Sequence, residues 1–244
     1  MIDLHFTTSP NSLKILIALE ELGLDYKIIK YDLYKGDHLA QAYRQINPNM
    51  KLPAIVDYDP QDGGEPYSVF ESGAILQYLA EKSGKLLPAD WRERWQAIQW
   101  LTWQVAGVGP NMGQAGHFLR YAPEGDHSYS INRYVNESKR LVQVLDNRLK
   151  RSPYLAGNEY SIADIACWPV FQMFCPYLGI ELADYENALR WRDEIQKRPA
   201  IQAAFSNPVM GGGSTREYDE KPKLTEEEWS NNFGDRMLKA VRED

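Results

Sequence analysis

Thiols and imidazoles are scarce in this sequence. Its 244 residues include two cysteines and four histidines. Cys167 and Cys175 lie in one apolar stretch and form neither a CxxC redox pair nor the cysteine framework of a disulfide-rich protein. The histidines show no ligand spacing with one another or with the cysteines. We therefore expect no metal site and no dithiol redox pair.

Excess positive charge and long apolar runs are also lacking. The 27 Lys and Arg residues are outnumbered by 34 Asp and Glu, which argues against nucleic acid as the main partner. No apolar run approaches the roughly 20 residues that span a bilayer. The opening "MIDLHF" contains an acid and lacks the basic region of a signal peptide. These features favour a cytoplasmic protein that binds neither nucleic acid nor membrane.

The residues that are present can build a substantial core, since 43% are hydrophobic and 12% aromatic. Residues 1–82 alternate strand-like and helix-like segments, in the order βαβ and then ββα. This is the order of a thioredoxin-like domain. The segments, read from their periodicity, are "IDLHFT", "PNSLKILIALEELG", "YKIIKYDL", "PAIVDY", "YSVF" and "SGAILQYLAEKSG".

The rest of the chain is predicted to be helical, which gives an α+β protein with an all-α second domain. Residues 83–90 have the composition of a linker, and residues 91–205 form the helical domain. Trp91 and Trp95 fall on one helix stripe and Trp100 and Trp103 on another. A helix that is apolar on two faces can pack against its own bundle and against a second subunit.

Residues 206–244 form a tail of different character. Its first part, "VMGGGSTREYDEKPK", is polar and glycine-rich, as in a flexible tether. The segment "TEEEWSNNFGDRMLKAVRED" then predicts an amphipathic helix that docks onto its own protein. Thr225 and Glu228 form a capping box at its start.

Three short segments can carry chemistry. In the first, Ser9 is an N-cap followed by Pro10 at the first helical position. Its hydroxyl can cap the helix and still donate a hydrogen bond outward. Asn11 adds little to helix stability, so its amide is a candidate donor. Neither side chain can serve as a general base.

The second segment is "NMKLPAIV" and the third is "FESGAIL". Only about 5–6% of X-Pro bonds in folded proteins are cis, but a cis Pro53 in a thioredoxin-like sheet would offer the Leu52 backbone to an extended peptide, with Lys51 beside it. Ser72 begins a helix, whose N-terminus favours an anion. With Glu71 for an ammonium, this helix start matches a free α-amino acid.

Together, "SPNSLK", "NPNMKLPAIV", "FESGAILQYLAEK" and "YLAGNEYSIADIACWP" resemble the cytosolic glutathione transferases over residues 1 to about 205. The sequence is most similar to the nu class, the bacterial disulfide-bond oxidoreductases related to the yeast nitrogen-regulation prion protein. Members typically carry Thr before Pro-Asn, where this chain has Ser9. The resemblance implies glutathione as co-substrate, a homodimer, and the following roles. Glu71 and Ser72 hold the γ-glutamyl group, Leu52 and a cis Pro53 the cysteinyl backbone, Lys51 and His38 the glycyl carboxylate, Asn11 and Ser9 the thiolate, and Arg133 a second ligand.

The implied reaction is reduction of small disulfides by two glutathiones, with no protein cysteine. A cysteine-like thiol has a pKa near 8.5, and lowering it by two units needs about 2.7 kcal/mol. One or two hydrogen bonds to the thiolate, about 1.5–3 kcal/mol each, can supply that. Two alternatives stay open. The first is conjugation of glutathione to electrophiles, as in theta-like enzymes that use a serine such as Ser9. The second is a non-catalytic binding module.

Overall fold

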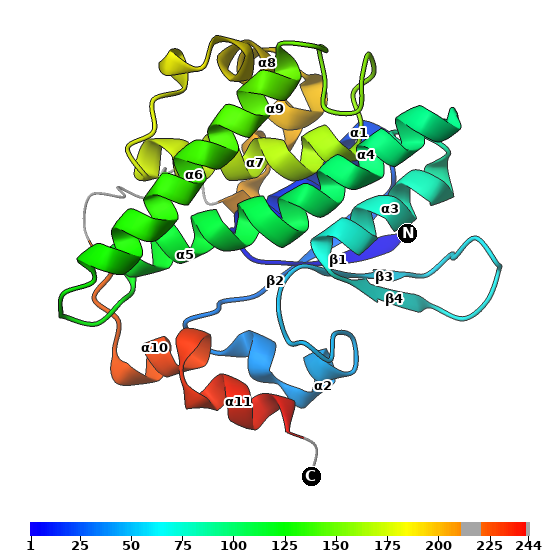
Figure 1. Ribbon diagram of the computed structural model, residues 1–244. Helices are drawn as coiled ribbons and strands as arrows, with labels where there is room; N and C mark the ends of the chain where they lie inside the picture. The colour runs from blue at the N-terminus through cyan, green and yellow to red at the C-terminus, as the bar shows by residue number, and fades with distance from the viewer. Residues whose placement is uncertain (211–220, 243–244) are drawn as a thin grey trace.

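The computed structural model describes residues 1–210 and 221–242. Its first part is a mixed four-stranded sheet with helices packed on it, and its second part is helical (Figure 1). The α+β fold and the βαβ-ββα order predicted from the sequence are both present. The elements of the first part are β1 (Ile2–Phe6), α1 (Pro10–Leu22), β2 (Tyr26–Lys30), η1 (Asp37–Leu39), α2 (Gln41–Arg44), β3 (Ala54–Asp57), β4 (Tyr67–Phe70) and α3 (Ser72–Ser83).

The strand order is β2-β1-β3-β4, with β1 parallel to β2 and antiparallel to β3. All five residues of the central strand β1 are buried, as expected for a strand covered on both faces. His5 pairs with Ala54, and Ala54 in turn pairs with Phe70. This register brings the end of β1, the start of β3 and the end of β4 to one edge of the sheet.

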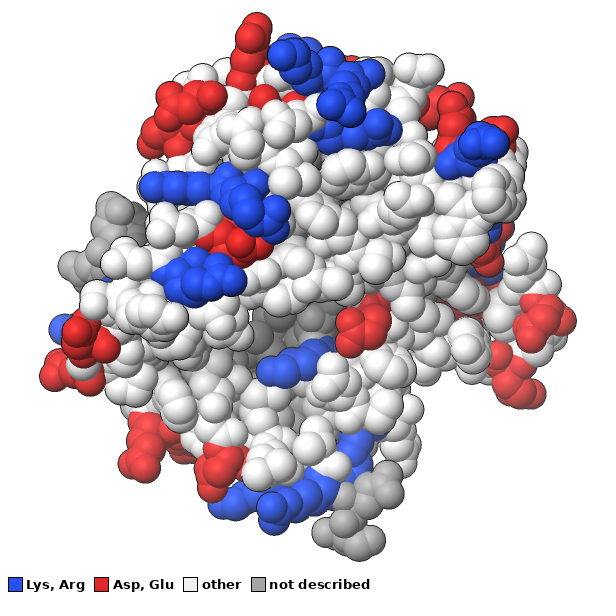
Figure 2. Space-filling model, viewed as in Figure 1, with Lys and Arg blue, Asp and Glu red and all other residues white. Residues whose placement is uncertain are grey.

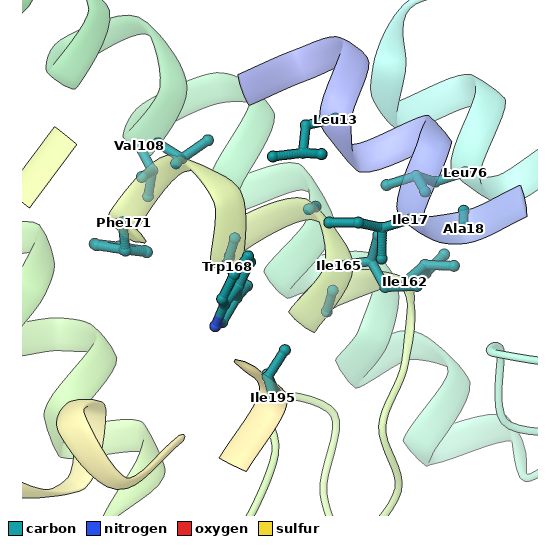
Figure 3. Packing of buried hydrophobic residues seen from close by; sticks show 14 of the residues in the cluster. Leu13, Ile17, Ala18, Leu76, Val108, Ile162, Ile165, Trp168, Phe171 and Ile195 are labelled. Atoms are coloured by element: carbon teal, nitrogen blue, oxygen red, sulfur yellow. The ribbon is translucent and has the colours of Figure 1, made fainter. Parts of the chain in front are cut away.

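Helix α1 connects the two parts of the molecule. It begins at the Ser9 cap with Pro10 in its first turn and ends at Gly23, whose φ of 64° suits glycine. Leu13 and Ile17 point from α1 toward α7, where Ile165 and Trp168 are buried (Figure 3). Because one continuous hydrophobic cluster includes both α1 and α7, the sheet and the helical part share a core.

The helical part follows a short connection, since α3 ends at Ser83 and α4 begins at Trp91. A π-helical segment, Gln104–Val108, separates α4 from α5. No helix within residues 1–210 and 221–242 is long and apolar enough to cross a membrane. The helices are α4 (Trp91–Trp103), α5 (Gly109–Arg120), α6 (Ser128–Leu149), α7 (Ile162–Tyr177), α8 (Glu186–Gln196) and α9 (Pro199–Ser206), with 3₁₀ turns η3 (Leu182–Asp184) and η4 (Pro208–Met210).

The tail contains two short helices, α10 (Glu226–Phe233) and α11 (Asp235–Val241), where the sequence predicts one. The break lies at Gly234, and the predicted Thr225–Glu228 capping box is present. Both helices lie beside η1 and α2, on the side of the sheet away from the helical bundle (Figure 1). The predicted tether falls mostly on residues 211–220, outside the described residues.

Candidate active site

The three chemistry-bearing segments meet at the sheet edge defined by the strand register. Ser9 ends the loop after β1 and Asn11 lies in the first turn of α1. The residues before β3 are Lys51, Leu52 and Pro53, and β4 leads directly into Glu71. Figure 2 shows a hollow between the helical bundle and the tail, with a basic and an acidic side chain at its rim. Segments far apart in the sequence are thus brought to a common place.

Asn11 and Ser9 have different surroundings. The Ser9 Oγ accepts from the Ser12 N–H at 3.3 Å and donates to the Ser12 Oγ at 3.2 Å. The Ser9 hydroxyl is thus used both as acceptor and as donor at the start of α1. Asn11 is exposed in the first turn of α1, and its Oδ1 accepts from Lys14 Nζ at 2.8 Å. Because Oδ1 is held inward, the Asn11 Nδ2 is the side-chain donor left for a ligand.

The Leu52–Pro53 peptide bond is cis, as the family resemblance implies. The loop before it is held by Tyr43 and Asn47, which donate to the Lys51 carbonyl at 2.7 and 2.6 Å. No hydrogen bond within residues 1–210 and 221–242 uses the Leu52 N–H or C=O. Leu52 can therefore pair with an extended peptide as an added strand would.

Glu71 and Ser72 form the start of α3. Glu71 is exposed and has a φ of 68°, a strained conformation that is found preferentially at ligand sites. Its Oε1 accepts from Asn49 at 3.4 Å, which links it to the loop before β3. Ser72 is 8% exposed, and its Oγ accepts from Lys14 at 3.4 Å. Carboxylate, hydroxyl and helix N-terminus lie together, as an amino-acid headgroup requires.

His38 is buried beneath the tail. It is 2% exposed and has a backbone hydrogen bond with Asn231 of α10, whereas its Nδ1 has no hydrogen-bond partner among the described residues. Burial, with Lys51 nearby, lowers the His38 pKa to about 4. The imidazole is therefore neutral near pH 7. The Lys51 Nζ lies 3.2 Å from the Met237 Sδ of α11, and burial lowers its pKa as well.

Arg133 is not joined to the other predicted residues. Its side chain is 57% exposed on α6 and pairs with Glu137 one turn further on, at 3.7 Å. No hydrogen bond or ion pair within residues 1–210 and 221–242 links it to the segments described above. Figure 2 shows several basic side chains over the part of the surface where α6 runs.

Sequence reasoning missed Lys14 and Gln104. The Lys14 ammonium is buried and donates to the Gln104 Oε1 at 2.6 Å, in addition to Asn11 and Ser72. A Cβ on Gly73 would lie 2.8 Å from Val105, so this glycine admits the π-helical segment that carries Gln104. The available signal was the position of Lys14 between Leu13 and Ile15, three residues after Asn11.

Both cysteines are buried in α7, away from solvent. Burial raises the pKa of each thiol, well above the usual value for Cys167 and to about 12 for Cys175. Among residues 1–210 and 221–242, no cluster of three or more His, Cys, Asp or Glu side chains is placed to hold a metal. A neutral, buried thiol is a poor nucleophile, so neither cysteine is a candidate for the reactive group.

A thioredoxin-like sheet followed by a helical part, with three polar segments at one sheet edge, defines a protein of the glutathione transferase class. Residues 8–82 match the profile of the glutathione S-transferase N-terminal domain, and residues 117–199 match that of the C-terminal domain. The chain belongs to the glutathione S-transferase family.

Two relatives are named for an activity. The disulfide-bond oxidoreductase YfcG of Escherichia coli is 50% identical, over 86% of this chain and 97% of its own. The disulfide-bond oxidoreductase YghU of the same organism is 39% identical, over 82% and 78%.

Solved structures of glutathione transferases resemble the chain throughout its main body. One from Burkholderia graminis, with two glutathione molecules bound per subunit, has a TM-score of 0.81 and 39% identity, over 85% of this chain and 88% of that one. One from Pseudomonas putida, with one glutathione disulfide bound, has a TM-score of 0.80 and 40% identity, over 85% and 91%.

Proposed function

We propose that the protein reduces small disulfides with two molecules of glutathione and no protein cysteine. The first glutathione thiolate attacks one sulfur of the disulfide, forms a mixed disulfide and releases a thiolate. The second glutathione thiolate attacks the glutathione sulfur of the mixed disulfide and releases the other thiolate. Glutathione disulfide and two thiols are the products, so the two electrons come from the two tripeptides.

The observation that carries this proposal is the contrast between Asn11 and the cysteines. The Asn11 amide donor faces outward at the start of α1, whereas both thiols of the chain are buried with raised pKa values. The nucleophile must therefore come with the substrate. Naming of the relative YfcG as a disulfide-bond oxidoreductase supports the same chemistry.

The site can favour a bound thiolate without a general base. Lowering a thiol pKa of about 8.5 by two units requires about 2.7 kcal/mol. A hydrogen bond from the Asn11 amide to the sulfur contributes about 1.5–3 kcal/mol, and the N-terminus of α1 adds about 0.3–1 kcal/mol. The sum reaches the requirement.

The positions of the residues support the binding roles that the family resemblance implies. Glu71 receives the γ-glutamyl ammonium, Ser72 and the start of α3 receive its carboxylate, and Leu52 pairs with the cysteinyl backbone. Lys51 supplies the charge for the glycyl carboxylate, and His38 contributes there as a neutral group. Arg133 is proposed for the second glutathione, as a cation on α6 that an anionic tripeptide can attract.

Conjugation to electrophiles remains the alternative reaction, since the same thiolate serves it. A theta-like mechanism would use the Ser9 hydroxyl, but that hydroxyl donates to Ser12. The exposed Asn11, Glu71 and Lys51 side chains argue against a non-catalytic binding module.

The test compares turnover of hydroxyethyl disulfide with that of chlorodinitrobenzene in the same preparation. We expect disulfide reduction to dominate and to survive in a Cys167→Ala/Cys175→Ala variant that remains folded. Dominant conjugation would overturn the proposed reaction, and loss of reduction in the folded double variant would overturn the absence of a protein thiol.

The protein is further proposed to act as a cytoplasmic homodimer. Trp91 and Trp95 on α4 are 69% and 46% exposed, with their rings 6.5 Å apart in an edge-on arrangement. Exposed adjacent tryptophans are typical of interface anchors. We divide the chain into a glutathione-binding domain (1–82), a linker (83–90), a helical domain (91–205) and a tail (206–244).

A further inference from the structure

Lys14 is a buried lysine whose ammonium donates to neutral acceptors. Its side chain is 1% exposed, and its Nζ donates to the Asn11 Oδ1 at 2.8 Å, the Gln104 Oε1 at 2.6 Å and the Ser72 Oγ at 3.4 Å. No ion pair within residues 1–210 and 221–242 includes it. The three protons of the ammonium are matched by three oxygens.

This arrangement is poorly explained by stability alone. A buried charge without a counterion is costly, and an apolar side chain of similar volume is often neutral or stabilising in its place. The Gln104 side chain adds to the cost, because its Oε1 faces Lys14 while its Nε2 is buried with no partner in the part of the chain that the structure describes. Burial also lowers the Lys14 pKa to about 7.

The contacts of Lys14 set the direction of two ligand-facing groups. An ammonium can only donate, so the Asn11 atom that faces it is the carbonyl oxygen, and the Asn11 Nδ2 is turned away. The Ser72 hydroxyl likewise accepts from Lys14, which leaves its own proton to donate. Without Lys14, the Asn11 amide could present its oxygen to the ligand, and an oxygen repels a thiolate.

We propose that Lys14 is a positioning residue that aims the Asn11 amide at the glutathione sulfur and the Ser72 hydroxyl at the γ-glutamyl carboxylate. The inference rests on the proposed function, because it assigns the residue that organises the same site. Lys14 does not touch the reacting atoms. It acts through its two neighbours and through its charge.

The ligand then supplies the counterion that the protein lacks. Of the groups near Lys14, Glu71 ahead of α3 is exposed, and the thiol of Cys167 on α7 is neutral because its pKa is raised. A bound thiolate and a bound carboxylate both stabilise the charged form of Lys14 and raise its pKa. Binding of a tripeptide analogue without a thiol, such as S-methylglutathione, is therefore coupled to proton uptake by Lys14, and its affinity should fall as the pH rises above about 7.

The test measures the pKa of the bound glutathione thiol from thiolate absorbance. The proteins are the wild type, Lys14→Met, Asn11→Ala and the double variant, with Lys150→Met as an exposed-lysine control. We expect Lys14→Met to raise the thiol pKa by at least one unit, with a loss of at least tenfold in kcat/KM near pH 7 that is recovered at higher pH. In the Asn11→Ala background, the same substitution should have a smaller effect. The Lys150→Met complex should match the wild type.

Other outcomes overturn the inference. A folded Lys14→Met variant that keeps the wild-type thiol pKa, or effects of Lys14→Met and Asn11→Ala that add in full, would refute positioning through Asn11. If Lys14→Met does not fold, Lys14→Gln can replace it, because glutamine retains a donor without the charge. The inference would be refuted if Lys14→Gln left both the thiol pKa and the pH dependence of S-methylglutathione binding as they are in the wild type. A wild-type complex with an ordinary thiol pKa would refute the proposed function itself.

Discussion

Asn11→Ala and Ser9→Ala form a matched pair of substitutions that separates the two donors at the start of α1. Both remove one polar group at the start of α1, and each group contacts a residue three positions further along the chain, Ser12 for Ser9 and Lys14 for Asn11. Ser9 uses its hydroxyl within the loop, whereas the Asn11 Nδ2 is left for the ligand. The first substitution should therefore act on the thiolate and the second on the helix.

The two substitutions should change different quantities, catalysis and thiol pKa for Asn11→Ala and folding stability for Ser9→Ala. Loss of a hydrogen bond to an anion costs about 1.5–3 kcal/mol, which is about 10- to 150-fold in kcat/KM for disulfide reduction near neutral pH. The pKa of the bound thiol should rise by about one to two units in Asn11→Ala. Ser9→Ala should instead cost about 0.5–2 kcal/mol of unfolding free energy through loss of the N-cap, with little change in the thiol pKa.

Steady-state reduction of hydroxyethyl disulfide across pH, together with thiolate absorbance of the glutathione complex, measures both effects. Urea denaturation measures the stability of each variant. A larger rise in the thiol pKa for Ser9→Ala than for Asn11→Ala would refute the role of Asn11, because Ser9 would then be the principal donor.

Three further predictions concern other parts of the molecule. Asp164→Ala should destabilise the protein by about 3 kcal/mol or more in urea denaturation, since the buried carboxylate accepts from the backbone N–H groups of Leu155 and Ser161 and from the Trp191 indole. The folded state keeps His38 neutral, so the unfolded state binds more protons between about pH 6.5 and 4. Thermal stability should therefore decrease as the pH is lowered from about 6.5 to 4, and the decrease should be smaller in His38→Asn. Trp95→Arg should shift the protein toward monomer in light scattering, whereas an unchanged mass would place the subunit interface elsewhere.

Local sequence rules predicted much of the fold because they act over short distances. The Ser9 cap, Pro10 in the first turn and the Gly23 stop bound α1 as helix termini usually do. The capping box of Ser161 and Asp164 opens α7 in the same way. The order of the strands was enough to predict the thioredoxin-like arrangement of the sheet.

Features that depend on tertiary contacts were not predictable. Lys14 has the polarity of a surface residue, and only the approach of Ser72 and Gln104 makes a buried ammonium tolerable. The tail was expected to dock, but nothing local indicated that Asn231 would cover His38 or donate to the Tyr34 carbonyl at 2.7 Å. Long-range contacts of this kind determine the charge state of the site, and so its chemistry.

The charges at the two ends of the proposed glutathione site are unequal, which predicts how glutathione is recognised. At the γ-glutamyl end, Glu71, Ser72 and the N-terminus of α3 offer partners for both charges of the headgroup, and Lys14 adds a cation behind them. Of the two residues proposed for the glycyl carboxylate, His38 is neutral and Lys51, beside Met237, is a cation. A single exposed charge contact is worth about 1 kcal/mol or less, so γ-glutamylcysteine should bind within about fivefold of glutathione. Cysteinylglycine, which lacks the headgroup, should lose at least tenfold more. Competition of each dipeptide against glutathione measures both affinities, and equal losses would show that the glycyl end contributes as much as the γ-glutamyl end.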